Sequence, residues 1–296
     1  MNVCMLGAGA MGSAMTARLL ERSFDVRIWD RTWEKADVLR AKGARAFRDV
    51  AAAVQDADVV VTMLADGAAV VSTMDPALRA MRSGSVWLQM STIGVEGTAQ
   101  AIALSGRRPD VVFVDAPVSG STGPARAGTL TILASGPKPS IDALEPLFAA
   151  LGHKTVWLGD AGAGSRMKLV LNSWLAMVVE GTAEFAALAT ALGVTLDRVA
   201  ECLQGGPLDA LLMRSKLAKI AARAFDSEFS LANAAKDVRL ALQAESSNSG
   251  GLSLPMLETL DREWRRPLAS GFGDQDVSVV YLALAERIPA TALLYR

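Results

Sequence analysis

The first half of the chain alternates short apolar, β-branched runs with segments of helical periodicity. A helix is predicted over Met11–Arg22 after the first strand. Repeated strand–helix units imply a parallel sheet with helices on both faces, which is an α/β doubly wound arrangement. The predicted strands are Asn2–Leu6, Asp25–Trp29, Asp58–Leu64, Ser85–Met90, Val111–Val114 and Leu130–Ala134, with Thr155–Leu158 as a further candidate.

The pattern changes after Gly159, where a glycine-rich loop is followed by helical periodicity alone. One long apolar helix is predicted over Arg166–Leu192, ending at Gly193. Further helices are predicted over Asp197–Leu203, Leu208–Ala224, Leu231–Ser246, Pro255–Arg265 and Val277–Glu286. For a chain of 296 residues we therefore expect two domains: a sheet domain at 1–162 and an all-helical domain at 163–296.

The charge balance and the cysteine content indicate which partners and which cell compartment to expect. Lys and Arg number 30 against 31 Asp and Glu, so nothing in the charge balance favours nucleic acid or an anionic membrane as a partner. Two distant cysteines, Cys4 and Cys202, do not form a disulfide framework. Together with the absence of basic residues before the first apolar run, this leads us to expect a cytoplasmic protein.

The most apolar helical stretch, Ser173–Leu192, contains Glu180 and Glu184 in its middle. Two carboxylates there favour a buried helix over a membrane span. The stretch is apolar on more sides than one small domain can cover, so we expect a homodimer in which the second domains pack together.

A glycine-rich turn follows the first strand directly. Gly7-Ala8-Gly9-Ala10-Met11-Gly12 has the G-x-G-x-x-G spacing between a strand and a helix. The first glycine permits a tight turn, the second leaves room for a pyrophosphate, and the third lets helix and strand pack closely. We therefore expect Gly7, Gly9, Ala10, Met11 and Gly12 to bind a dinucleotide at the start of the helix.

The residues at the end of the second strand indicate whether the cofactor is NAD or NADP. Asp30 suits the ribose hydroxyls of NAD, whereas Arg31, Thr32 and Lys35 could hold the extra phosphate of NADP. We expect NADP, on the condition that Asp30 turns toward solvent or pairs with Arg31. An exposed helix start is the competing interpretation of the two cations.

Three further segments carry a family resemblance. Asp115-Ala-Pro-Val-Ser-Gly-Ser-Thr-Gly123 follows a strand, Gly162-Ala-Gly-Ser-Arg-Met-Lys-Leu-Val-Leu-Asn172 opens the long helix, and Lys236-Asp237 lies on a later helix. With the glycine motif, and in this order, they resemble the β-hydroxyacid dehydrogenase family, which includes 3-hydroxyisobutyrate dehydrogenases and glyoxylate/succinic semialdehyde reductases. The resemblance covers essentially the whole chain.

The resemblance implies a Rossmann domain, an all-helical domain and a long helix between them. It implies that Lys168 is the catalytic acid-base. It implies substrate contacts from Ser119, Gly120, Asn172, Phe229 and Asp237, and cofactor contacts from Met63, Leu64, Thr92 and Lys236. Many family members have a second glycine where this chain has Ser121, so the wall of the substrate pocket differs there.

The chemistry of these residue types agrees with the resemblance. Hydride transfer to a carbonyl leaves charge on oxygen, which requires a proton donor. The only histidine, His153, is expected to be a polar residue of the turn Gly152–Lys154, so Lys168 is the natural candidate. Asn172 lies one helical turn further on the same face. Ser119, Gly120 and Ser121 offer hydroxyl and backbone N–H groups that suit a substrate carboxylate.

Structural alternatives exist for several of these residues. Lys168 could be a solvated lysine near a helix start, Ser119–Ser121 an ordinary loop, and Lys236-Asp237 an exposed ion pair. Phe229 could simply pack at the flank of a helix. Trp174 and Trp264 are expected in the core or at a subunit interface.

Two other functions remain open from the sequence. One is an imine reductase, although those proteins usually lack the lysine at the position of Lys168. The other is a non-catalytic NAD(P)-binding interaction module. The function we expect is hydride transfer between a nicotinamide cofactor and a small β-hydroxy acid or its semialdehyde or oxo-acid partner.

Overall fold

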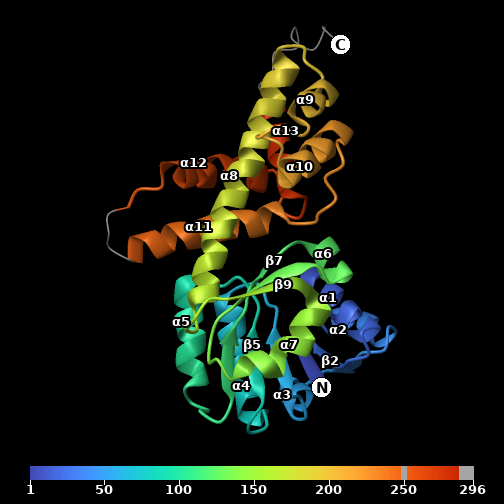
Figure 1. Ribbon diagram of the computed structural model, residues 1–296, viewed down its shortest axis with the longest axis vertical. Helices are drawn as coiled ribbons and strands as arrows, with labels where there is room; N and C mark the ends of the chain where they lie inside the picture. Colours follow the sequence, from blue (N-terminus) through green and yellow to red (C-terminus); the bar gives the residue numbers. More distant parts are fainter. Residues whose placement is uncertain (248–251, 287–296) are drawn as a thin grey trace. The chain divides into compact units, whose positions relative to one another are not determined.

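The structure, a computed structural model, describes residues 1–247 and 252–286 (Figure 1). It divides the chain into two compact units, of which the first comprises Met1–Lys168 and the second begins at Leu169. Helix α8, Ala163–Ala191, starts in the first unit and continues into the second. This confirms the fold class expected from the sequence, which is a Rossmann-type sheet followed by an all-α domain.

The first unit is built on a six-stranded sheet in which every neighbouring pair is parallel. The strand order β3-β2-β1-β4-β5-β6 is the order of a doubly wound dinucleotide-binding sheet. The strands are β1 (Asn2–Leu6), β2 (Asp25–Trp29), β3 (Arg45–Phe47), β4 (Val59–Thr62), β5 (Val86–Gln89) and β6 (Val112–Asp115). Of the six strands of this sheet, the sequence pattern predicts all but the three-residue β3.

Helices cover both faces of this sheet because its strands are apolar on both sides (Figure 1). Successive side chains point to opposite faces. Val3 and Met5 lie in one core with residues of α1, α2 and α7, while Cys4 and Leu6 lie in another with residues of α3, α4 and α5. These helices are α1 (Ala10–Glu21), α2 (Trp33–Arg40), α3 (Val50–Val54), α4 (Gly67–Ala80), α5 (Gly94–Ser105) and α7 (Ser140–Leu151).

A second, three-stranded sheet completes the unit. It consists of β7 (Val118–Ser119), β8 (Leu130–Ala134) and β9 (Gly152–Trp157), with α6 (Thr122–Ala127) between the first two. The expected turn at Gly152–Lys154 is wrong, because these residues begin β9 and continue the parallel pairing with β8. His153 is therefore an exposed strand residue whose Nδ1 lies 2.7 Å from the carbonyl oxygen of Thr129.

The described part of the second unit contains helices and no strand. After α8 it comprises α9 (Leu196–Leu203), α10 (Leu211–Ala222), α11 (Leu231–Ser247), α12 (Pro255–Ala269), the 3-10 turn η1 (Val277–Val279) and α13 (Val280–Ala285). The sequence placed the start of α8 three residues late, at Arg166. It also merged η1 and α13 into one helix, because the apolar pattern continues through both.

Two buried polar pairs hold the helices of this unit together. The ammonium of Lys216 on α10 lies 2.9 Å from both carboxylate oxygens of Asp276. The indole N–H of Trp264 donates to Glu180 at 2.6 Å. Burial raises the pKa of Glu180, and the Trp264 bond opposes that rise. Trp264 is thus a core residue as expected, whereas Trp174 is exposed.

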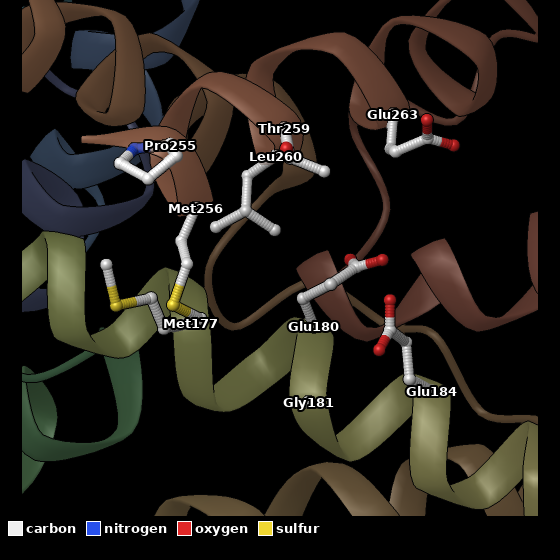
Figure 2. A pocket seen from close by; sticks show the side chains of 9 residues that line it. All are labelled: Met177, Glu180, Gly181, Glu184, Pro255, Met256, Thr259, Leu260 and Glu263. Atoms are coloured by element: carbon white, nitrogen blue, oxygen red, sulfur yellow. The ribbon is translucent and has the colours of Figure 1, made fainter. Parts of the chain in front are cut away.

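A cavity of about 360 Å³ opens between α8 and α12 (Figure 2). Carboxylates of Glu180, Glu184 and Glu263 gather on one side of it, and apolar side chains line the other. Its lining residues are Met177, Glu180, Gly181, Glu184, Pro255, Met256, Thr259, Leu260 and Glu263. None of the residues expected to bind cofactor or substrate lies in it.

By length and composition alone, α8 could also cross a membrane, with a mean hydropathy of 1.2 over its most apolar window. A long core helix of a soluble protein passes the same test. One third of that window, 33%, is buried inside the described structure, and Glu180 lies within the helix.

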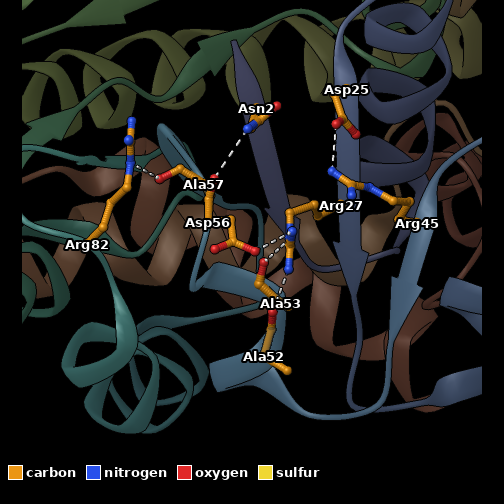
Figure 3. A network of polar contacts seen from close by, with 9 residues as sticks. All are labelled: Asn2, Asp25, Arg27, Arg45, Ala52, Ala53, Asp56, Ala57 and Arg82. Atoms are coloured by element: carbon orange, nitrogen blue, oxygen red, sulfur yellow. Dashed lines mark hydrogen bonds and ion pairs between the residues drawn. The ribbon is translucent and has the colours of Figure 1, made fainter.

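A buried arginine fastens α3 to the sheet (Figure 3). Arg27 on β2 donates from Nε to the carbonyl oxygen of Ala53 and from Nη2 to that of Ala52, each at 2.7 Å. These are carbonyls at the end of α3, where no intrahelical donor is available. The guanidinium also lies 3.2 Å from Asp56 and stacks over the Phe47 ring at 4.3 Å.

The two cysteines differ completely in their surroundings. Cys4 is fully buried on β1, and burial raises the pKa of its thiol to about 12 despite the nearby Arg27. Cys202 lies on α9 and is exposed. Both are free thiols in the structure.

Candidate cofactor and active site

The glycine loop is forced by close backbone approaches. Gly7 has φ of 114°, and a Cβ there would overlap the carbonyl oxygen of Met63. A Cβ at Gly12 would overlap the carbonyl oxygen of Gly7. Neither position can accept a side chain without moving backbone, so the turn and the packing of α1 on β1 both depend on glycine.

Gly9, in contrast, has room for a side chain within the protein. No atom lies within 4 Å of the position a Cβ would take there. It is the N-cap of α1, no side chain caps this helix end, and Ala10 and Met11 form its first turn. The open space above Gly9 and the free helix terminus fit a dinucleotide pyrophosphate.

Asp30 is held inward by two backbone donors. Ala8 N–H donates to its Oδ2 at 2.7 Å and Thr32 N–H to its Oδ1 at 2.8 Å. The carboxylate is therefore fixed beside the glycine loop. It makes no ion pair with Arg31 among the described residues, and Arg31, Thr32 and Lys35 are all exposed. The condition attached to the NADP expectation is not met by this conformation.

The remaining expected cofactor residues of the first unit lie at the carboxyl ends of strands. Met63 and Leu64 follow β4, and Thr92 follows β5, all half-buried. Leu64 N–H donates to Ser91 Oγ at 2.9 Å, which ties the two loops together. In open parallel sheets ligands bind outside this edge, and the loops after β1, β2, β4 and β5 meet there.

The segment expected to hold the substrate carboxylate is a tight turn between β7 and α6. Ser119 is the last residue of β7, and Ser121 is the N-cap of α6 without using its side chain to cap it. Gly120 has φ of 129°, and a Cβ there would lie 2.8 Å from the Leu130 side chain. The positive φ and the close Leu130 side chain thus require glycine at this turn, and the Ser121 hydroxyl makes no cap hydrogen bond to α6.

The start of α8 is clamped by a buried carboxylate. Asp115, at the end of β6, is fully buried. Its Oδ2 accepts the Ser165 backbone N–H and its Oδ1 accepts the Ser165 hydroxyl, both at 2.8 Å. Ser135 Oγ accepts the Gly164 N–H at 2.9 Å, and Thr98 Oγ1 donates to Ser165 Oγ at 2.9 Å. Two first-turn N–H groups of the helix are thereby satisfied.

Burial and hydrogen bonding shift the pKa of Asp115 in opposite directions. Burial raises the pKa of Asp115, and hydrogen bonds from Ser165 and Ser135 counteract the rise. A carboxylate at a helix N-terminus also interacts favourably with the helix dipole. Asp115 and Ser165 lie within the two sequence motifs 115–123 and 162–172, whereas Ser135 and Thr98 lie outside them, and the sequence alone assigned a role to none of the four. An acid ending a strand and a serine in the first turn of a helix were the available signals.

Lys168 lies in the second turn of α8, directly beyond this clamp. Lys168 is only 8% exposed, which rules out the alternative that it is a solvated lysine near a helix start. Asn172, one turn further along the helix, is 5% exposed. Both polar side chains are thus withdrawn from solvent, and the three residues between them, 169–171, are apolar.

In the second unit, the structure joins two of the expected substrate residues. Asn172 Nδ2 donates to Asp237 Oδ2 at 2.5 Å, and both side chains are buried. The Lys236 ammonium lies 3.2 Å from Asp237 Oδ1, so these two residues are not an exposed ion pair. Phe229 is half-buried in the loop before α11, and its carbonyl oxygen accepts the Val277 N–H.

No candidate metal centre accompanies these residues. Among the residues the structure describes, no group of three His, Cys, Asp or Glu side chains is arranged to hold a metal ion.

Comparisons with known proteins agree with this geometry. The model of the NAD-binding domain of 6-phosphogluconate dehydrogenase matches residues 2–159. The model described as the NAD-binding domain of NADP-dependent 3-hydroxyisobutyrate dehydrogenase matches residues 162–284. The fold and the glycine loop thus define a nicotinamide dinucleotide-binding protein.

Three curated relatives are informative. Glyoxylate/succinic semialdehyde reductase 1 of Arabidopsis thaliana is 31% identical over 290 residues, covering 96% of this chain and 98% of the relative. NAD-dependent L-serine dehydrogenase of Pseudomonas aeruginosa is 33% identical over 293 residues, covering 94% and 96%. Cytokine-like nuclear factor N-PAC of Xenopus tropicalis is 31% identical, but the match covers only 53% of that relative.

Solved structures extend the comparison. A 3-hydroxyisobutyrate dehydrogenase of Mycobacterium tuberculosis with L-serine superposes with a TM-score of 0.85 at 29% identity, covering 96% of this chain and 98% of that one. An imine reductase from Pseudomonas sp. superposes with a TM-score of 0.61 at 22% identity, covering 96% and 99%, and shows likeness of fold alone. The chain belongs to the β-hydroxyacid dehydrogenase family.

The glycine loop generates a matched pair of variants. Gly9→Ala should fold with an unchanged thermal midpoint, because a Cβ there meets no atom, yet raise the dissociation constant for NAD(P)H by about tenfold or more. Gly12→Ala should lower the free energy of unfolding by roughly 1–3 kcal/mol, because backbone must move. Calorimetry and cofactor fluorescence titration measure both. Normal cofactor affinity in Gly9→Ala would place the pyrophosphate elsewhere.

Proposed function

We propose that this protein transfers hydride between a nicotinamide cofactor and a small β-hydroxy acid or its semialdehyde or oxo-acid partner, with Lys168 as the general acid-base. The observation that carries the proposal is a lysine buried in the second turn of α8, next to the clamp that ties this helix to the carboxyl edge of the sheet. When bound, the nicotinamide supplies or accepts the hydride.

Lys168 would handle the proton that accompanies the hydride. In reduction its ammonium gives a proton to the substrate oxygen as the carbonyl carbon gains hydride, and the product is an alcohol. In oxidation the neutral amine takes the hydroxyl proton back. The Asp115 clamp keeps the first turn of α8 in place, so the lysine reaches the same point in each turnover.

The substrate carboxylate would bind at Ser119, Gly120 and Ser121. The positive φ of Gly120 turns the backbone sharply there, and two hydroxyls flank it. The family resemblance adds Asn172, Phe229 and Asp237 on the substrate and Lys236, Met63, Leu64 and Thr92 on the cofactor. Relatives named for glyoxylate, succinic semialdehyde and L-serine support a small carboxylate substrate.

Two alternatives compete with this proposal. The first is an imine reductase, because a solved structure of that name shares the fold, and the second is a non-catalytic NAD(P)-binding module, because one relative is named as a nuclear factor. The buried Lys168 favours carbonyl chemistry over both, because imine reductases usually lack a lysine at this position and because a binding module has no use for a proton donor.

The proposal predicts the behaviour of Lys168 variants. Lys168→Ala should lower kcat by about 10²-fold or more while cofactor affinity changes little. Lys168→Arg is the matched control: it keeps the charge but cannot release a proton at neutral pH, so it should also fail. The assay is NAD(P)H oxidation with glyoxylate, succinic semialdehyde, tartronate semialdehyde and methylmalonate semialdehyde. Near-normal turnover in Lys168→Ala would remove this lysine from the mechanism.

For the cofactor we propose NAD in place of the NADP expected from Arg31, Thr32 and Lys35. Asp30 points its carboxylate toward the glycine loop and is fixed there by two backbone N–H groups. A fixed anion suits the ribose hydroxyls of NAD and repels a 2′-phosphate. One relative is named as NAD-dependent.

Asp30→Asn tests this proposal. The amide removes the charge and keeps one acceptor, so the ratio of kcat/KM for NADPH over NADH should rise by about tenfold or more. Arg31→Ala is the companion variant and should leave the wild-type preference for NADH in place. A wild type that prefers NADPH, with the preference lost in Arg31→Ala, would restore the NADP assignment.

We further propose that the protein is a cytoplasmic homodimer without nucleic acid or membrane partners. In the second unit, α8 presents exposed apolar side chains at helical spacing, including Val170, Trp174 and Leu188, and Leu192 follows directly after the helix. Trp174 is 66% and Leu192 70% exposed. Such a face favours burial against a second copy.

Light scattering should therefore give the mass of a dimer at micromolar concentration without detergent. Trp174→Glu should shift the mass toward the monomer, since it places a charge in an apolar contact. Glu201→Gln, an exposed change on α9, should not. A clean monomer mass for the wild type would refute the proposed assembly.

A further inference from the structure

The amide of Asn172 has a defined orientation because its partner can only accept. Asp237 Oδ2 lies 2.5 Å from Asn172 Nδ2, and an ionised carboxylate has no proton to donate. The amide nitrogen therefore faces Asp237, and the carbonyl oxygen of Asn172 points elsewhere. A short bond between two buried side chains, 5% and 4% exposed, leaves little freedom for the amide to flip.

Asp237 is itself held on its other oxygen. The Lys236 ammonium lies 3.2 Å from Oδ1, so the carboxylate stands between a cation and an amide. Lys236 and Asp237 are neighbours on α11, and Asn172 is on α8. The Asp237 carboxylate thus connects α11 to α8 at Asn172, one helical turn beyond Lys168.

We propose that Asp237 is a positioning residue: its carboxylate fixes the amide of Asn172 so that the Asn172 carbonyl oxygen is presented as an acceptor on the face of α8 that carries Lys168. This deepens the proposed function and rests on it. The family resemblance implies that Asp237 contacts the substrate. The present geometry assigns its effect to Asn172, because its Oδ2 is already engaged in a short bond with that residue.

An acceptor at this place has a specific use. Asn172 lies one helical turn beyond Lys168, where i and i+4 side chains are neighbours. An oriented carbonyl oxygen can accept a proton from an ammonium or from the hydroxyl of an alcohol substrate. Loss of Asp237 would free the amide to rotate and leave its buried NH₂ group without this acceptor.

The test is a double-mutant cycle on kcat and KM. Asp237→Ala should lower kcat about tenfold, with a smaller change in KM, because misorientation affects the reacting geometry. Asp237→Asn should be clearly milder, since its amide oxygen can still accept from Asn172. In an Asn172→Ala background, Asp237→Ala should lower kcat by less than about twofold further, because the residue through which it acts is gone.

Opposite results overturn the proposal. If the effects of Asn172→Ala and Asp237→Ala multiply, or Asp237→Asn is as damaging as Asp237→Ala, then Asp237 acts directly on substrate or cofactor. Asp261→Asn is the matched control: Asp261 is another buried carboxylate of the second unit, paired with Arg265 at 2.6 Å, and should leave kcat unchanged.

A second cycle, on the free energy of unfolding, does not need activity. The same two alanine variants and their double should show a coupling between Asn172 and Asp237, and a coupling of zero would overturn the pair. A wild type that oxidises no NAD(P)H with any of the oxo acids would refute the proposed function instead. The two failures are therefore distinguishable.

Discussion

The structure depends most on a single buried carboxylate at the junction of strand and helix. Asp115 ends β6 and accepts both the backbone N–H and the hydroxyl of Ser165 in the first turn of α8. The cost of burying a charge is offset by these donors and by the dipole of the helix. The first residues of α8, which belong to the same unit as the sheet and end at Lys168, are thereby positioned relative to the sheet edge.

Much of the fold follows from local patterns, and the exceptions have physical causes. Strands such as Leu130–Ala134 are apolar runs between turn residues, and the sequence predicts them to the residue. The short β3 and β7 have too few residues to show a period. His153 was misplaced because Gly152 resembles a turn, whereas it is packed against β8, where a Cβ would crowd Ile132.

In the candidate site, too, some features follow from the local sequence and others do not. Glycines are predictable where backbone must approach backbone, as at Gly7 and Gly12. The direction of a side chain is not, because it depends on partners distant in sequence. Asp30 is held by Ala8, and Asn172 by Asp237, over separations of 22 and 65 residues. The role of Asp115 was hidden for this reason, although its motif was visible.

The contrast between the two thiols has a practical consequence. Cys4 lies at the centre of the sheet with its pKa raised to about 12, so it stays protonated and out of reach of reagents in the folded protein. Cys202 is exposed on α9 and is the only other cysteine of the chain. The native sequence therefore carries one addressable handle, on the helical unit. A maleimide dye or spin label attached there reports on that unit without any engineered cysteine.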